Sequence, residues 1–216
     1  MLSSKVFCFN PFRENTYLLY ETFGNQAMIL DPGCHSRDEQ NELVQFVSDN
    51  QLNPIAVWLT HCHIDHVLGL AFCIEKWNIP YYLSFPEIAQ LKAVEVYAPS
   101  FGIFNTWLPE KEGVVFEAEE IRLGDEQFRI LQIPGHSPGH LGFYHALSGQ
   151  IWSGDVLFNQ GIGRTDLPGG DLETLKNSIM EKLYTLPENT VVHPGHGPST
   201  SIGFEKMMNP FFKLRS

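Results

Sequence analysis

Short apolar runs alternate with turn residues along the first third of the chain, which is the pattern of strands. The turns are marked by Asn10-Pro11 and by Asp31-Pro32-Gly33. A helical spacing of apolar residues begins after Ser36, which predicts a helix with this serine as its N-cap. The pattern predicts strands at residues 5–10, 16–20, 26–30, 55–59 and 80–83, and a second helix at 67–77.

The second half of the chain follows an irregular stretch at residues 97–112. This stretch fits either a lid over a substrate or an ordinary surface loop, and its aromatic residues Phe101, Phe104 and Trp107 could line a pocket or pack in the core. Gly124-Asp125 is a hairpin turn signal, and Asp171 is a suitable N-cap for a helix at 171–186. Strands are predicted at residues 120–123, 127–133, 141–145, 151–153 and 190–192.

Both halves show the same order of predicted elements, in which strands are followed by a helix, a strand and a loop that contains histidine. This order predicts an α+β protein with two sheets packed face to face and helices outside, a four-layer αββα sandwich. No repeat or linker divides the sequence, so we expect one domain spanning residues 1–216.

Composition narrows the possible partners. The chain has 216 residues, 43% of them hydrophobic, and a formal net charge of -11, which is typical of a globular protein and disfavours nucleic acid as a partner. Neither a signal peptide nor a membrane span is apparent. The four cysteines, one of them Cys62, fit no zinc finger and no redox pair, so reduced thiols and a cytoplasmic enzyme acting on a small molecule are expected.

The strongest chemical signal is the segment that follows the strand at 55–59. His61, His63, Asp65 and His66 lie within six residues. Residues i and i+2 of an extended segment point to the same side, so His61 and His63 can share one metal ion. Asp65 and His66 lie where the loop enters the next helix and can serve a second ion, because one ion cannot accept all four ligands with tetrahedral geometry. Cys62 lies between two ligands, and its side chain is expected to point away.

Three further candidates each follow a strand within a glycine-containing turn. They are His136 in Pro134-Gly135-His136, Asp155 in Ser153-Gly154-Asp155, and His196 in Pro194-Gly195-His196. Imidazole and carboxylate ligands without thiolate suit zinc, iron or manganese. Among the other histidines, we expect His140 to contact or pack behind the ligands, His145 and His193 to be structural, and His35 to be exposed.

With these motifs, the chain resembles the metallo-β-lactamase superfamily and, within it, the glyoxalase II-like hydrolases. The family motif H-x-H-x-D-H is present as residues 61–66, and its later single histidine, bridging aspartate and final histidine match His136, Asp155 and His196. The resemblance implies the αββα fold and a supporting role without metal binding for Asp31. It also implies that the helical region that grips glutathione in longer glyoxalase II enzymes is missing here.

The resemblance also implies a ligand set for two divalent ions, with zinc favoured over iron and manganese. His61, His63 and His136 would hold the first ion, Asp65, His66 and His196 the second, and Asp155 would bridge them. Two such ions can lower the pKa of a bridging water to about 7 and polarise a carbonyl, which suits hydrolysis of a thioester. Asp155 and Asp65 are therefore the predicted catalytic residues, the latter as a possible proton shuttle besides its ligand role.

Other functions remain open from the sequence. A mononuclear iron persulfide dioxygenase would use His61, His136 and Asp155 as a facial triad. A nuclease or phosphodiesterase is disfavoured by the negative charge, and antibiotic hydrolysis by the presence of the bridging Asp155. A purely structural metal site is the least favoured, because such sites are usually rich in thiolates. For Arg164, binding of an anionic substrate and anchoring of its own loop are equally compatible with the sequence.

Overall fold

The computed structural model describes residues 1–104, 108–109 and 112–212, and it divides into two compact units. Unit 1 consists of Met1–Glu117 with Arg122–Glu126, and unit 2 consists of Ala118–Ile121 with Gln127–Ser216. Each unit contains one six-stranded sheet. The expectation of a single domain stays a prediction.

The sheet of unit 1 has the strand order β1-β2-β3-β4-β5-β6. Its first three strands are antiparallel, whereas β3 to β6 run parallel. The apolar pattern predicted the first five of these strands. The predicted bounds of β3 equal the observed ones, and those of β1, β2, β4 and β5 are close to them. The strands are Leu2–Phe9, Glu14–Glu21, Gln26–Leu30, Asn53–Trp58, Tyr81–Leu83 and the short Val114–Val115.

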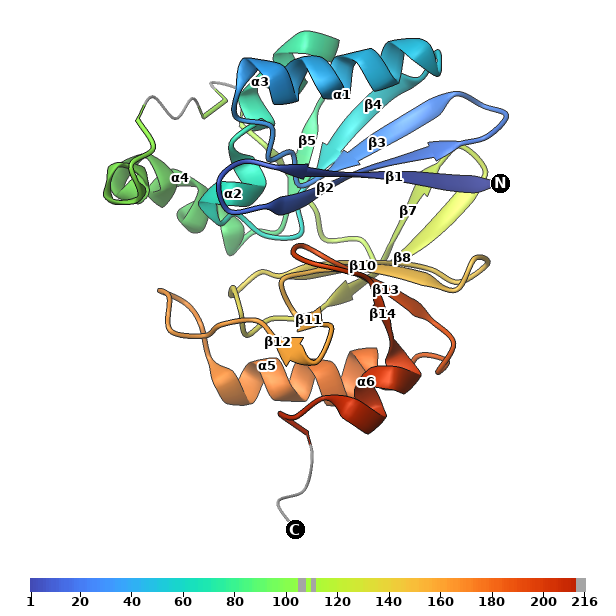
Figure 1. The fold of residues 1–216 in the computed structure, drawn as a ribbon, viewed down its shortest axis with the longest axis vertical. Helices are drawn as coiled ribbons and strands as arrows, with labels where there is room; N and C mark the ends of the chain where they lie inside the picture. The colour runs from blue at the N-terminus through green and yellow to red at the C-terminus, as the bar shows by residue number, and fades with distance from the viewer. Residues whose placement is uncertain (105–107, 110–111, 213–216) are drawn as a thin grey trace. The chain divides into compact units, whose positions relative to one another are not determined.

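Helices α1 (Arg37–Asp49) and α3 (Leu70–Trp77) cover one face of this sheet (Figure 1). Both contribute to one buried cluster with the strands, α1 through Leu43 and α3 through Leu70. As predicted, Ser36 is the N-cap of α1, in a reciprocal capping box with Glu39 that satisfies orphan backbone donors. The predicted helix at 67–77 is two helices, because the four-residue α2 (Ile64–Val67) ends before α3 begins.

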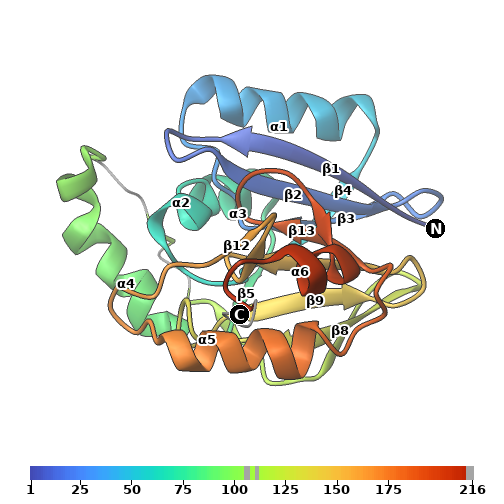
Figure 2. The ribbon, with the colours of Figure 1, turned by 60° about the horizontal axis from the view of Figure 1, so that its bottom comes forward.

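A further helix of unit 1, α4 (Glu87–Tyr97), lies beside α2 (Figures 1 and 2). It was not predicted, and it continues into the 3-10 turn η1 (Ala98–Phe101). The stretch at 97–112 therefore begins as helix rather than as loop. Phe101 and Phe104 are exposed there, while Trp107 lies outside the described residues.

The sheet of unit 2 has the order β14-β13-β10-β9-β8-β7. β8, β9 and β10 are antiparallel neighbours, and β10 pairs in parallel with β13. The strands are Glu120–Leu123, Glu126–Gln132, Leu141–His145, Gln150–Gly154, Val191–Pro194 and Thr200–Ser201. A small separate hairpin, β11 (Leu157–Phe158) and β12 (Gly161–Ile162), follows β10 and was not predicted.

Two helices cover one face of this second sheet (Figure 1). The predicted helix at 171–186 is α5 (Leu172–Ser178), capped by Asp171 as expected, and continues as the π-helical turn η2 (Ile179–Leu183). The helix α6 (Ile202–Met208) was not predicted. Leu175, Ile179 and Ile202 of these segments are fully buried against the strands. Among the described residues, no helix is both long and apolar enough to cross a lipid bilayer.

Candidate metal centre

Three imidazoles meet in the loop that follows β4 in unit 1. The ring of His61 lies 4.7 Å from that of His63 and 4.2 Å from that of His66, centroid to centroid. His61 and His66 are fully buried and His63 is nearly so. The Asp65 carboxylate lies 3.7 Å from Nε2 of His66. The loop thus gathers the four predicted ligands of unit 1 within a short stretch of chain.

The carboxylate of Asp31 contacts His66 directly and His61 through Thr60. It accepts hydrogen bonds from the Thr60 backbone N–H (2.7 Å) and from the Thr60 hydroxyl (2.5 Å), and Nδ1 of His66 lies 3.1 Å from it. The Thr60 oxygen lies in turn 3.0 Å from Nδ1 of His61. Because Nδ1 of both histidines is engaged, Nε2 is the atom directed away from this network and suited to a metal.

Asp31 is itself close enough to His61 and His66 to count as a candidate ligand, since one acceptor or donor atom of each lies within 4.8 Å of the others. Its oxygens, however, already accept from Thr60 and face Nδ1 of His66. The supporting role that the family resemblance implied for Asp31 fits this geometry better than metal ligation.

A second buried acid, Glu14, lies near His66. One of its oxygens accepts from the Thr16 hydroxyl at 2.7 Å, and the other lies 4.0 Å from Nδ1 of His66. Burial raises the pKa of the Glu14 carboxyl well above its usual range, and the nearby His66 opposes that rise. Sequence analysis missed Glu14, although an acid at the start of a buried strand is an unusual residue that signals a polar function.

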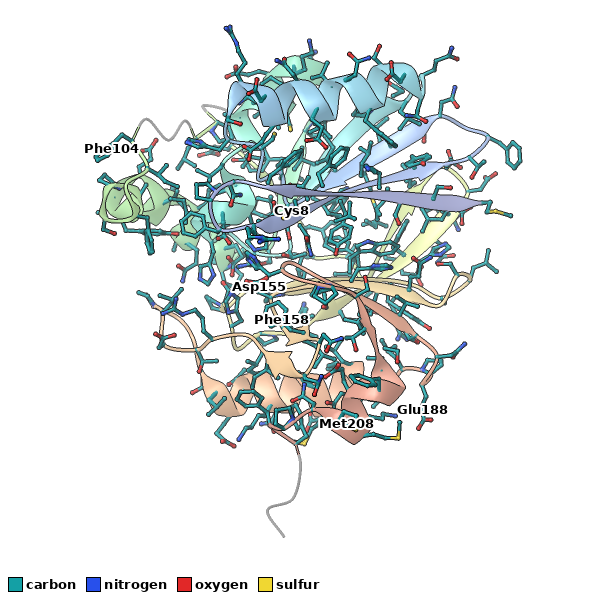
Figure 3. The ribbon with its side chains drawn as sticks, in the orientation of Figure 1. Cys8, Phe104, Asp155, Phe158, Glu188 and Met208 are labelled. Carbon is teal, nitrogen blue, oxygen red and sulfur yellow. The ribbon has the colours of Figure 1, made fainter. Side chains whose placement is uncertain are left out.

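Unit 2 gathers the remaining three predicted ligands. One oxygen of Asp155 lies 3.7 Å from Nε2 of His136 and 3.5 Å from Nε2 of His196. Asp155 lies just after β10 and before the β11–β12 hairpin, near Phe158 (Figure 3). Its carboxylate therefore stands between the two imidazoles, as a carboxylate shared by two ions would.

Backbone contacts orient two of these residues. Nδ1 of His136 lies 2.8 Å from the carbonyl oxygen of Arg164, so Nδ1 carries the proton and Nε2 is left for a metal. The Asp155 N–H donates to Nε2 of His140 at 3.2 Å. The prediction that His140 supports the ligands from behind is confirmed by this contact. A side chain at Gly163 would collide with the Asp155 carbonyl, its Cβ lying 2.0 Å away, so glycine is required there.

The other singled-out side chains have clear surroundings. His193 stacks on Trp152 and contacts Gln150 and Ser199, and burial lowers the pKa of its imidazole to about 4. His145 contacts Ser148 across the hairpin turn, so both histidines are structural, as predicted. Cys62 belongs to the buried apolar cluster of unit 1, which confirms that its side chain points away from the ligands.

The guanidinium of Arg164 forks onto the exposed carboxylate of Asp166 through two hydrogen bonds of 2.7 Å. These hydrogen bonds from Arg164 lower the pKa of the Asp166 carboxyl to about 2. The side chain of Arg164 therefore anchors its own loop, and that loop presents the carbonyl that orients His136. Anion binding by Arg164 remains a prediction.

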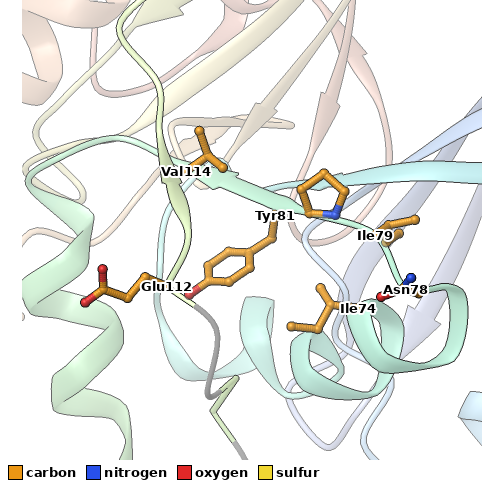
Figure 4. Close-up of a pocket in the computed structure, with 7 residues that line it drawn as sticks. Ile74, Asn78, Ile79, Tyr81, Glu112 and Val114 are labelled. Carbon is orange, nitrogen blue, oxygen red and sulfur yellow. The ribbon is translucent and has the colours of Figure 1, made fainter.

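A cavity lies elsewhere in unit 1, beside β5 and the end of α3 (Figure 4). It has a volume of about 280 Å³, and its walls include Ile74, Tyr81 and Val114. The polar residues at its rim are Asn78 and Glu112. This cavity contains none of the predicted ligands, so it does not belong to the candidate metal centre.

The donor set within each unit fits divalent cations of the zinc, iron or manganese type. In unit 1, Nε2 of His66 lies beside the Asp65 carboxylate, and in unit 2, Nε2 of His136 and of His196 lie beside the Asp155 carboxylate. Nδ1 contacts a carboxylate at His66, a hydroxyl at His61 and a backbone carbonyl at His136. Hydrogen bonds of this kind fix the tautomer and orientation of metal-binding histidines. Among the described residues, no cysteine belongs to a cluster of candidate ligands, and Cys62 lies in the apolar core.

Comparison with known proteins agrees with this donor set. A family model described as the metallo-β-lactamase superfamily matches residues 9–196. The "Probable metallo-hydrolase YqgX" of Bacillus subtilis is 40% identical over 93% of both chains. The "Hydroxyacylglutathione hydrolase GloC" of Haemophilus influenzae is 37% identical over 95% of both chains.

Solved structures with the same fold superpose on nearly the whole chain. The B3 metallo-β-lactamase BLEG-1 is 35% identical and superposes with a TM-score of 0.88, covering 98% of this chain and 100% of its own. TTHA1623, in a di-iron-bound form, is 36% identical with a TM-score of 0.85, covering 96% of this chain and 100% of its own. The predicted α+β fold of metallo-β-lactamase type is thereby confirmed. The chain belongs to the metallo-β-lactamase superfamily and is one of its metallo-hydrolases.

Proposed function

We propose that the chain hydrolyses a thioester of a small molecule, in the manner of the glyoxalase II-like branch. The observation that carries this proposal is the Asp155 carboxylate between Nε2 of His136 and Nε2 of His196, because a carboxylate in this position can serve two ions. The relative described as a hydroxyacylglutathione hydrolase, 37% identical, supports the substrate class.

In this proposal the ligands of unit 1 and those of unit 2 form one centre for two ions. His61, His63 and His136 would hold one ion, Asp65, His66 and His196 would hold the other, and Asp155 would be shared by both. When bound, such ions supply a hydroxide at neutral pH and polarise the scissile carbonyl. Hydrolysis breaks the bond between acyl carbon and sulfur and gives a carboxylate and a thiol, whose ordinary pKa of about 8.5 makes it a good leaving group.

The residues of the chain contribute orientation and proton transfer. Asp31 and the Arg164 carbonyl keep Nε2 of His66 and His136 free of protons and aimed at the centre. His140 fixes the backbone of Asp155 and thereby the position of the shared carboxylate. Asp65, partly exposed beside His66, is the residue best placed in unit 1 to pass a proton to the leaving thiolate.

The experiment measures cleavage of a lactoyl thioester by protein loaded in turn with zinc and iron, with and without oxygen. Iron is included because TTHA1623, a protein of the same fold, is described in a di-iron form. We expect cleavage without oxygen by the zinc form, and a loss of tenfold or more, about 1.4 kcal/mol, in His66→Ala and His196→Ala. Persulfide-dependent oxygen uptake with iron, and no thioester cleavage with any metal, would establish the dioxygenase alternative instead.

β-Lactam hydrolysis is the second candidate, because BLEG-1 is described as a B3 metallo-β-lactamase. The bridging role proposed for Asp155 disfavours it, and that expectation is tested on the same zinc-loaded preparation with a chromogenic cephalosporin. A rate on the cephalosporin that exceeds the rate on the thioester would reverse the order of the two candidates.

A further inference from the structure

The backbone of the ligand loop, residues 61–66, forms hydrogen bonds with side chains of α4. The Cys62 N–H donates to a carboxylate oxygen of Glu87 at 2.8 Å, and both residues are fully buried. Two residues farther along the loop, the Ile64 N–H is hydrogen-bonded to the hydroxyl oxygen of Tyr97. Glu87 and Tyr97 are the first and the last residues of α4, so side chains at both ends of the helix are hydrogen-bonded to the loop.

These two bonds alternate with the predicted ligands. In the order His61, Cys62, His63, Ile64, Asp65, the second and fourth residues donate their N–H groups to α4, and the side chains of the odd-numbered residues are the predicted ligands. The side chains of Cys62 and Ile64 are buried in the apolar cluster of unit 1. The non-ligand positions of the motif are thus fixed by backbone bonds and by packing together.

The bond from Ile64 has a second consequence. Ile64 is the first residue of α2, and His63 at its N-cap makes no side-chain capping bond. The first N–H groups of a helix need an acceptor from outside the helix. The Tyr97 hydroxyl supplies one, which leaves the His63 imidazole free of a capping role.

We propose that Glu87 and Tyr97 are positioning residues, which hold the backbone of the ligand loop so that its imidazoles and Asp65 meet a metal with the correct spacing. Glu87 belongs to none of the clusters of candidate ligands found among the described residues. The inference goes beyond the proposed reaction, but it rests on the metal centre of that proposal. It also gives α4 a role that its sequence did not indicate.

The experiment compares metal affinity rather than activity. Zinc binding is measured by competition with a chelating dye, and the visible spectrum of the cobalt-substituted protein reports ligand geometry. The variants are Tyr97→Phe, which removes one oxygen, Glu87→Leu, which removes the acceptor, and Glu87→Gln, which keeps an acceptor oxygen. The matched controls are Tyr184→Phe, which removes a half-buried hydroxyl bonded to a backbone carbonyl in unit 2, and Glu95→Gln on the exposed side of α4.

We expect Tyr97→Phe and Glu87→Leu to weaken zinc binding about 10- to 100-fold, the scale found for groups that orient metal ligands, and to alter the cobalt spectrum. Glu87→Gln should lie closer to wild type than Glu87→Leu, and both controls should match wild type. If Glu87→Leu does not fold, Tyr97→Phe decides.

Two results would overturn the inference in different ways. Wild-type protein that binds two ions, together with a Tyr97→Phe variant of unchanged affinity and spectrum, refutes the positioning role alone. Wild-type protein that binds no metal refutes the proposed function and the positioning role with it.

Discussion

Replacing Asp31 by asparagine changes one atom in the network behind the ligand loop and tests how that network controls the metal. The carboxylate accepts two hydrogen bonds from Thr60 and faces Nδ1 of His66 at 3.1 Å. An asparagine keeps one acceptor oxygen and gains a donor NH2 group. If the oxygen stays with the Thr60 N–H, the NH2 group faces Nδ1 of His66, and two donors then oppose each other.

The imidazole of His66 can relieve this conflict by moving its proton from Nδ1 to Nε2, where it blocks metal binding. Loss of such an orienting partner costs about 10- to 100-fold in metal affinity, or about 1.4 to 2.8 kcal/mol. The assay is zinc competition with a chelating dye on Asp31→Asn, with Asp49→Asn as the control, because Asp49 is exposed on α1. An Asp31→Asn variant with the affinity of wild type would refute the tautomer argument.

Three further predictions concern other parts of the structure. Asp155→Ala should lose more thioester cleavage than His196→Ala, because the carboxylate is proposed to touch both ions; equal rates would contradict the bridging role. Cys62→Ala should keep both metal equivalents in elemental analysis, since the thiol lies in the apolar cluster. For metal-free protein, the unfolding free energy measured with urea should fall between pH 7 and pH 4, and this fall should be smaller by roughly 3 kcal/mol in His193→Gln. The sign follows because the His193 imidazole, with its pKa lowered by burial from 6.5 to about 4, stays neutral in the folded protein while the unfolded chain takes up a proton.

The ligand loops could be predicted because their signal is local. Each ligand group follows an apolar run, and the strands at 26–30, 120–123 and 141–145 were predicted at the bounds that the structure has. The helix α4 could not be predicted in the same way. Val96 on this helix is exposed, Leu91 and Val94 are buried, and the residues that fix it in place are the polar Glu87 and Tyr97. A stripe of apolar residues is the signal that sequence analysis reads, and this helix depends on hydrogen bonds to a distant loop.

The same reason explains the missed hairpin and the missed acid. The strands β11 and β12 have two residues each, which is too short for any periodicity to show. Their position depends on Glu205, a buried acid on α6 that accepts from the Gln160 N–H in the hairpin turn. Glu14 likewise acts through Thr16 and His66, which only the folded sheet brings beside it. Polar contacts between remote segments were thus the part that the sequence pattern could not supply.

The two units support their ligands by different means, and this difference has a consequence for metal loading. In unit 1, buried side chains hold the loop on two sides, Asp31 with Thr60 on one and α4 on the other. In unit 2, a backbone carbonyl orients His136, and His196 is the most exposed of the three ligands. Closely packed and fully bonded groups keep one arrangement, whereas exposed loop residues sample several. Each proposed site takes two ligands from unit 1, so the difference between the sites comes from unit 2, where His136 is buried and oriented by a carbonyl and His196 is more exposed. A single ion supplied to metal-free protein should therefore be bound first by the site of His61, His63 and His136.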